Sequence, residues 1–178
     1  MSKKTPNIHI YWLLSGIAAF LCSIAVFTFL LFQQLQNVSY TQALDIPYTA
    51  DQVVILVNQE RTKNGLPPLK INPLLTRAAQ NKNQHMIEYN YFSHVSPKDG
   101  KKWSDFIKEV KYNYVEAGEN LANGFLVASD MVEAWMNSPT HKANILAEGY
   151  KETGVAVNKG KLNGRETVFV TQMFGRTR

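Results

Sequence analysis

The stretch AWMNSPTHKANIL, residues 134–146, decides how this sequence folds. A tryptophan, a Ser-Pro pair and a histidine follow one another within it, and a proline ends a helix because it cannot donate a backbone hydrogen bond. We therefore predict a helix over residues 128–137 and a restart, capped by Thr140, that continues through Leu146. The tryptophan then faces the core, and His141 lies at the break, where functional side chains concentrate.

Other helices are predicted before this stretch from apolar spacing and capping residues. Thr49 and Gln52 form a capping box, Asn72 is an N-cap in front of a proline, and Gly65 follows the first helix as a C′ glycine. The expected helices cover residues 50–64, 73–89 and 103–110.

Two stretches with β-branched residues at alternate positions close the chain and predict strands. They cover residues 153–158 and 167–174, and the segment KGKLNGRE between them is expected to be a hairpin loop. Gly118–Leu121 is expected in a loop. Helices come first and the sheet comes late, which predicts an α+β domain.

An uncharged apolar segment near the N-terminus predicts a membrane anchor. Residues 10–32 contain no charged side chain and are long enough to cross a bilayer as a helix. Lys3 and Lys4 precede the segment and no Lys or Arg follows before Arg61, so we expect a single-pass protein with its N-terminus in the cytoplasm.

A cleaved signal peptide is the alternative interpretation of this segment. A signal peptide has a shorter apolar core and a small-x-small cleavage site, and neither feature fits FTFLLFQQLQNVSY. The sequence therefore favours a signal anchor. The expected parts are a cytoplasmic N-terminus (residues 1–9), a transmembrane helix (10–32), a linker (33–48) and an extracytoplasmic domain (49–178).

Charge and cysteine content limit the classes of partner and compartment. Without Lys3 and Lys4, 17 of the 19 Lys and Arg residues remain, against all 14 Asp and Glu residues, which gives a net charge of +3. The basic residues are scattered along the sequence, so no nucleic-acid partner is predicted. The only cysteine, Cys22, lies in the apolar segment, so the domain is disulfide-free, which favours a bacterial cell envelope.

Three residues are candidates for chemistry. His94 ends YFSH before a turn, Glu119 lies between a glycine and an asparagine, and His141 lies at the helix break. Two imidazoles and one carboxylate can hold a zinc ion that keeps an open position for water, or can form an acid–base pair. The structural alternative, in which each histidine bonds a backbone carbonyl, remains open at this stage. His85, within the second helix, is expected to have no chemical role.

Five motifs in order give the sequence a family resemblance. YFSH with SPKDG, GENLA, AWMNSPTHKANIL, ETGVAV and VTQMFG resemble the motif series of the CAP superfamily, whose domain is also called the SCP domain. The superfamily comprises cysteine-rich secretory proteins, antigen 5 and pathogenesis-related class 1 proteins. The resemblance covers about residues 50–176 and implies an α/β/α sandwich with a central antiparallel sheet and a large cleft.

The resemblance also implies a cleft tetrad of two histidines and two acidic residues that binds a divalent metal in some members. His94, Glu119 and His141 match three members, and Gln172 matches a family glutamine at the cleft. Ser138 stands where relatives have the second acid, as in shorter bacterial forms, which leaves three candidate metal ligands and implies weak or absent metal binding.

Three functions are compatible with this sequence. The first is a membrane-anchored binding module whose cleft takes a lipid, a wall fragment or a peptide. The second is a hydrolase in which His94, Glu119 and His141 hold a metal or activate water directly. The third is a structural or interaction domain. Because fold membership does not determine function, whether the chain is an enzyme stays open here.

Overall fold

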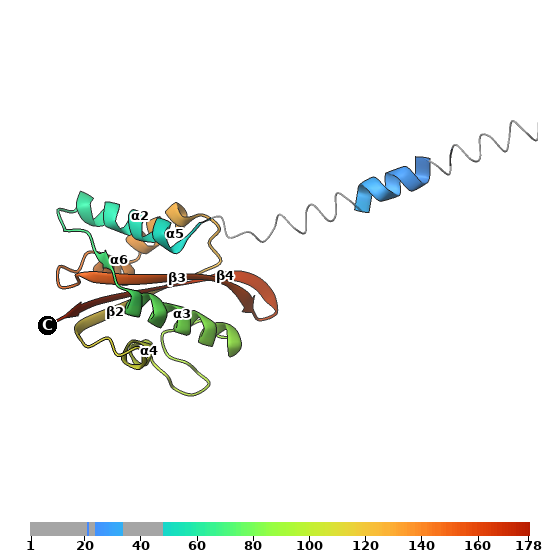
Figure 1. Ribbon diagram of the computed structural model, residues 1–178. Helices are drawn as coiled ribbons and strands as arrows, with labels where there is room; N and C mark the ends of the chain where they lie inside the picture. The colour runs from blue at the N-terminus through green and yellow to red at the C-terminus, as the bar shows by residue number, and fades with distance from the viewer. Residues whose placement is uncertain (1–20, 22–23, 34–47) are drawn as a thin grey trace, which may run out of the picture. The chain divides into compact units, whose positions relative to one another are not determined.

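The computed structural model describes residue 21, residues 24–33 and residues 48–178 (Figure 1). The chain divides into two units, Met1–Asp45 and Ile46–Arg178, which are described separately.

In the first unit, residues 24–33 are helical. No helix in the described part of the chain is long and apolar enough to cross a membrane. The predicted span 10–32 lies largely outside the described residues, as do the predicted cytoplasmic segment 1–9 and most of the linker 33–48.

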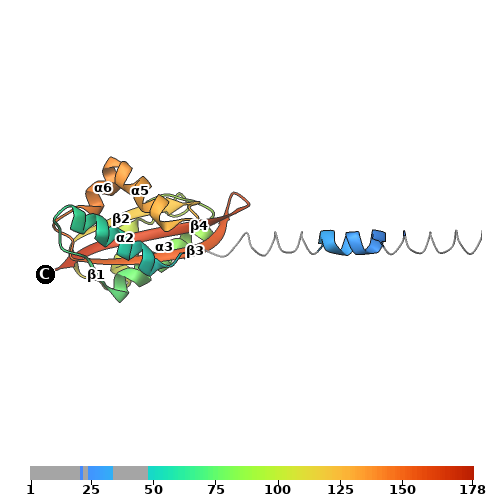
Figure 2. The same cartoon turned by 90° about the horizontal axis from the view of Figure 1, so that it is seen from above.

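The second unit is an α+β domain with helices on both faces of one sheet, as predicted. Helices α2, α5 and α6 cover one face, and α3 and α4 cover the other (Figures 1 and 2). The elements are α2 (Ala50–Lys63), β1 (Lys70–Ile71), α3 (Pro73–Glu88), α4 (Trp103–Glu109), β2 (Tyr114–Asn123), α5 (Ala128–Asn137), α6 (Pro139–Ile145), β3 (Glu152–Leu162) and β4 (Arg165–Thr177).

The sheet has the strand order β1-β3-β4-β2. Strands β3 and β4 form an antiparallel hairpin, β2 pairs antiparallel with β4, and the two-residue strand β1, which was not predicted, pairs parallel with β3. The expected hairpin loop KGKLNGRE was wrong, because most of it continues the two strands. Asn163 (φ 52°) and Gly164 (φ 78°) alone make the turn, and both have the left-handed backbone that a two-residue hairpin requires.

Strand β2 contains the GENLA motif, so the loop expected at Gly118–Leu121 was also wrong. β2 is the edge strand opposite β1, and its outward carbonyls take side-chain donors. Three alternate carbonyls accept such bonds: Ala117 from Tyr150 (3.2 Å), Glu119 from Asn144 (3.1 Å) and Leu121 from Trp135 (3.0 Å). The helical layer thereby covers the sheet edge.

The helix starts show which capping predictions hold. The capping box of Thr49 with Gln52 and the Asn72 cap are confirmed. The predicted Thr140 cap is wrong, because α6 begins at Pro139 and Ser138 is its N-cap. Proline is favoured at the first helical position, since the N–H that it lacks would have no helical partner.

Helix α3 lies directly on strand β3. A Cβ added to Gly154 would overlap backbone atoms of Leu75 and Thr76. Beside this contact, α3 buries Leu75, Ala78 and Ala79 against the sheet. This close approach fixes the position of α3, the helix that supports the candidate site described next.

Candidate functional site

The site begins with the segment between α3 and α4, which carries His94. The backbone of this segment is closed by a bridge between Val95 and Lys102, and the His94 carbonyl accepts the Trp103 N–H at 3.1 Å. The His94 side chain is 53% exposed. The segment therefore presents a fixed backbone and an accessible imidazole.

His94 and Glu119 form a close pair across two parts of the domain. His94 Nδ1 lies 2.6 Å from Glu119 Oε1, and the Glu119 side chain is only 1% exposed. An ionised carboxylate can only accept, so in the neutral imidazole of His94 the bond assigns the proton to Nδ1 and leaves the Nε2 lone pair free. This is the arrangement of a histidine whose orientation and tautomer are set by a carboxylate.

The charge on Glu119 depends on opposing effects. Burial raises the pKa of the Glu119 carboxyl, while the bond from His94 and the charge of Lys82 oppose that rise. Glu119 Oε2 is buried and has no hydrogen-bond partner among the described residues. The carboxylate thus uses one oxygen for His94 and depends on nearby charge for the rest of its stabilisation.

Lys82 supplies that charge from beneath the site. Its side chain, on α3, is fully buried, and Nζ donates to the carbonyl of Ser93 at 2.7 Å and to that of His94 at 3.4 Å. Burial lowers the pKa of the Lys82 ammonium, and the charge of Glu119 opposes this. Lys82 therefore holds the backbone that carries His94.

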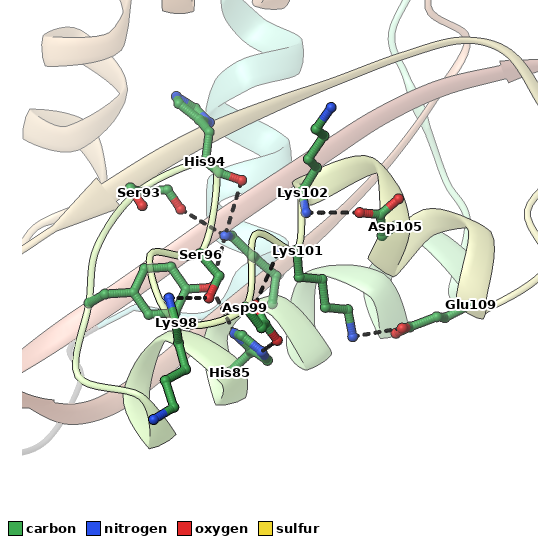
Figure 3. Close-up of polar contacts among 12 residues, drawn as sticks. His85, Ser93, His94, Ser96, Lys98, Asp99, Lys101, Lys102, Asp105 and Glu109 are labelled. Atoms are coloured by element: carbon green, nitrogen blue, oxygen red, sulfur yellow. Dashed lines mark hydrogen bonds and ion pairs between the residues drawn. The ribbon is translucent and has the colours of Figure 1, made fainter.

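A hydrogen-bonded chain extends from Lys82 to the surface. Lys82 Nζ lies 3.3 Å from the Tyr91 hydroxyl, which is 2.8 Å from His85 Nδ1, and His85 Nε2 is 3.2 Å from Asp99. Burial is the main reason why the pKa of Tyr91 rises to about 12. Figure 3 shows His85 bonded to Asp99, with His94 at the opposite end of the group. His85 thus has a structural partner on each ring nitrogen.

His141 approaches from the other helical layer. Its Nδ1 lies 2.9 Å from the Ser138 hydroxyl, and its ring centroid is 6.3 Å from that of Trp135, which is buried as predicted. Burial, and secondly the charge of His94, lower the pKa of His141. Neither His94 nor His141 uses Nδ1 to bond a backbone carbonyl. The structural alternative, in which each histidine makes such a bond, therefore does not describe Nδ1 of either residue.

Two asparagines connect His141 to the strand that carries Glu119. Asn120 Nδ2 donates to the His141 carbonyl at 3.2 Å, and Asn144 donates to Asn120 Oδ1 at 2.9 Å. Arg61, fully buried on α2, holds the end of the same helix by donating to the Ile145 carbonyl at 2.7 Å. Helix α6 is thus attached at both ends.

Gln172 lies elsewhere. It is fully buried on β4, pairs with Asn120 across the ladder, and donates to Thr153 Oγ1 at 3.1 Å. Directly paired residues share a face of the sheet and neighbours alternate, so Gln172 is on the opposite face from Glu119. The structure brings His94 and Glu119 together with His141 nearby, and does not bring Gln172 to that pair.

The geometry does not supply a complete metal site. Within the described residues no group of three or more His, Cys, Asp or Glu side chains is arranged to hold a metal ion. His94 Nδ1 bonds Glu119 Oε1 and His141 Nδ1 bonds the Ser138 hydroxyl, which leaves one ring nitrogen, Nε2, on each histidine. Ser138, at the position of the missing acid, contributes a hydroxyl to His141 instead of a carboxylate to a metal.

Sequence reasoning missed Lys82, Tyr91, Asn144 and Arg61 as parts of the site's support. A lysine on the apolar face of a predicted helix was the available signal for Lys82, because a buried lysine requires partners. No comparable signal identified the hydrogen-bond partners of Lys82, which lie 9 to 12 positions further along the chain.

A family model decides the assignment. Residues 54–174 match the model of the CAP, or cysteine-rich secretory protein, family. This chain belongs to the CAP family. The predicted resemblance is confirmed, although the domain has none of the cysteines for which that family is named.

Relatives and solved structures agree with this CAP assignment. The uncharacterized protein YkwD of Bacillus subtilis is 43% identical over 104 residues (58% of this chain, 40% of the relative), and the uncharacterized membrane protein YlbC of the same species is 35% identical over 108 residues (61% and 31%). This CAP chain thus spans less than half the length of either relative.

Two solved structures share the fold. An extracellular protein with an SCP domain from Bacillus anthracis has a TM-score of 0.62 at 30% identity, covering 72% of this chain and 40% of that one. An outer surface protein of Borrelia burgdorferi has a TM-score of 0.62 at 23% identity, covering 72% and 92%. The second likeness shows the fold alone.

Proposed function

We propose that this chain is a membrane-anchored, extracytoplasmic CAP-domain protein whose site binds a wall fragment or peptide. The observation that carries the proposal is the pair of His94 with buried Glu119, beside His141. The pair offers an exposed imidazole in a fixed orientation, which suits hydrogen bonding to a polar ligand better than burial of a lipid tail.

The anchor is supported by the uncharged segment 10–32 and by the helix at residues 24–33. That helix exposes apolar side chains, including Val26 (59%) and Phe27 (63%). The relative YlbC is called a membrane protein, and the Bacillus anthracis structure is called extracellular. The N-in orientation rests on Lys3 and Lys4.

Intact mass and protease access test the location. Full-length protein should stay with the membrane fraction and keep residues 1–36, and protease added to intact cells should digest the domain. A released form that lacks residues 1–36 would contradict the anchor. Protection of the domain in intact cells would contradict the orientation.

Histidine NMR tests the ligand. Soluble wall fragments, short peptides and lipid vesicles are added in turn to labelled protein, and we expect saturable shifts of the His94 and His141 ring signals with a polar ligand. His94→Ala should abolish the shift of the His141 ring signal, while Gln59→Ala, at an exposed position on α2, should not. Shifts with vesicles alone would favour the lipid, and no response to any class would contradict the binding module.

A second candidate, hydrolysis, is favoured by the same bond. A carboxylate that holds Nδ1–H of an exposed histidine leaves Nε2 free to accept a proton from water, as a general base does. Turnover of a wall fragment or peptide that His94→Ala abolishes, with the circular dichroism unchanged, would favour this function. Binding without turnover would favour the first.

A further inference from the structure

A separate groove lies at the end of the sheet where β3 begins and β4 ends. It consists of two hollows, of about 910 and 410 Å³, whose linings share Glu152 and Thr177. The strand register places Lys70 opposite Glu152 and Tyr114 opposite Thr177, so both hollows belong to one edge of the domain. We call this combined surface the basic groove.

The groove gathers basic residues that are scattered in the sequence. Six cations line it: Lys70, Lys108, Lys111, Lys151, Arg176 and Arg178. Lys108 pairs with Asp105 and Arg176 with Glu116. Lys151 donates to the Glu148 carbonyl at 2.9 Å, and Lys70, Lys111 and Arg178 form no ion pair with another described residue. Folding thus creates a concentration of positive charge that sequence order does not reveal.

Glu152 is the one acidic residue in the lining, and its oxygens are already occupied. Oε1 accepts from Asn72 at 2.8 Å, and Oε2 accepts from the Tyr112 hydroxyl at 2.7 Å. Its single negative charge stands against the six cations of the lining, so the lining as a whole remains positively charged. The groove also meets the N-terminus of the 16-residue helix α3, whose first turn contains no acidic side chain. A helix N-terminus adds positive potential there.

Lys111 has an unusual backbone for its residue type. Its φ is 61°, in the left-handed region, and the side chain is exposed at the groove. Such a conformation in a residue other than glycine costs free energy and is concentrated at functional sites. The chain thus maintains an unfavourable backbone at a position where it presents an unpaired cation.

We propose that the basic groove binds a linear polymer of phosphate groups. Two hollows that share Glu152 and Thr177 suit an extended chain better than a compact anion. Lys70, Lys111 and Arg178, the cations without an ion-pair partner among the described residues, line these hollows. The helix N-terminus favours phosphate. This proposal does not depend on how the His94 site works, because the two sites share no residue.

Binding to sodium polyphosphate, measured by fluorescence anisotropy with full-length protein in a neutral detergent, tests the proposal. The groove variant carries Lys70→Gln, Lys111→Gln and Arg178→Gln. The control variant carries Lys159→Gln, Lys161→Gln and Arg165→Gln, three exposed cations of the β3–β4 hairpin with no ion pair among the described residues. Both variants change the net charge equally, and circular dichroism checks their folding.

We expect saturable binding, and the logarithm of the association constant should fall linearly with the logarithm of the salt concentration. The groove variant should lose about tenfold or more in affinity and have a shallower salt slope, while the control should change by less than about twofold. Equal losses in both variants would reduce the effect to net charge and overturn the site. No binding at low salt would overturn it too, and equal affinity for polyglutamate of matched length would overturn the assignment to phosphate.

Discussion

His94 and Glu119, 25 positions apart, meet through a 2.6 Å bond between Nδ1 and Oε1, with the imidazole half-exposed and the carboxylate buried. The exposed partner can meet a ligand, and the buried partner fixes its orientation. A carboxylate in this position determines which ring nitrogen is available to the ligand.

The tautomer of His94 should therefore depend on Glu119. Ring ¹⁵N shifts of the neutral wild-type imidazole should place the proton on Nδ1, and Glu119→Ala should shift the population toward the Nε2–H form because the acceptor is lost. Glu116→Ala, at an exposed carboxylate of the same strand, is the control and should leave the ring unchanged. An Nε2–H form in the wild type would contradict the assigned bond.

Lys82 should contribute much more to stability than an exposed lysine. Lys82→Met keeps the volume but removes the donor to Ser93, His94 and Tyr91, so we expect a loss of about 2–4 kcal/mol in the free energy of unfolding. Lys101→Met, which breaks a partly exposed pair with Glu109, should cost about 1 kcal/mol or less. Urea denaturation measures both, and equal losses would contradict the role of Lys82.

His141 should make the domain less stable in mild acid. Burial and the charge of His94 lower its folded pKa from 6.5, so the unfolded state binds the proton more readily. The contribution is fully present above pH 6.5 and is lost as pH falls toward the folded pKa. Subtracting the unfolding free energies of His141→Gln from those of the wild type between pH 8 and pH 5 isolates this effect.

The effect of the His94 charge on the pKa of His141 can be measured directly. In an NMR titration, His94→Ala should raise the pKa of His141, because the positive charge that disfavoured protonation is gone. The desolvation effect should remain, so the pKa of His141 should stay below 6.5. Two results would contradict the predicted direction of these effects. One is that the unfolding free energy of the wild type minus that of His141→Gln grows as pH falls, and the other is that the pKa of His141 falls in His94→Ala.

The α3 contact predicts a severe packing defect. In Gly154→Ala the new methyl group overlaps the backbone of Leu75 and Thr76, which cannot move without displacing α3. We expect a loss of more than about 2 kcal/mol, or failure to fold, measured by thermal unfolding. Gly65→Ala is the comparison, since only its left-handed backbone (φ 74°) is strained and no atom lies within 4 Å. Its loss should be about 1 kcal/mol.

Local sequence signals predicted the helices well, because their causes are local. Thr49 with Gln52 and Asn72 with the following proline act within one turn, and both caps hold. The strand at GENLA was not predicted, because the side chains that bond the outward carbonyls of this edge strand, such as Asn144 and Trp135, come from distant segments. The parallel pairing of β1 with β3 is also non-local, and a two-residue strand has no period to detect.

The candidate site divides in the same way. Motif resemblance identified His94, Glu119 and His141, which the structure places near one another. It also placed Gln172 with them, although strand alternation puts Gln172 on the opposite face of the sheet from Glu119. The basic groove was not predicted at all. Its six cations are separated by up to 108 positions, from Lys70 to Arg178, and only the fold brings them together.

Ser138 should be the position that limits metal binding. Its hydroxyl lies 2.9 Å from His141 Nδ1, so a carboxylate introduced by Ser138→Glu would lie beside the imidazole. An adjacent negative charge favours protonated histidine, so the pKa of His141 should rise. The same carboxylate adds an oxygen ligand to two available imidazoles, and three protein ligands are the usual number for an open zinc site.

Zinc calorimetry on residues 46–178, which contain the whole domain core, tests this position. We expect no saturable one-to-one binding in the wild type and saturable binding in Ser138→Glu that His94→Ala removes. Ser129→Glu, at an exposed position in the first turn of α5, changes the net charge equally and should not create binding. Saturable wild-type binding that is lost in His94→Ala would instead show that Ser138 is compatible with a metal, and would favour a zinc-dependent hydrolase over metal-free contacts.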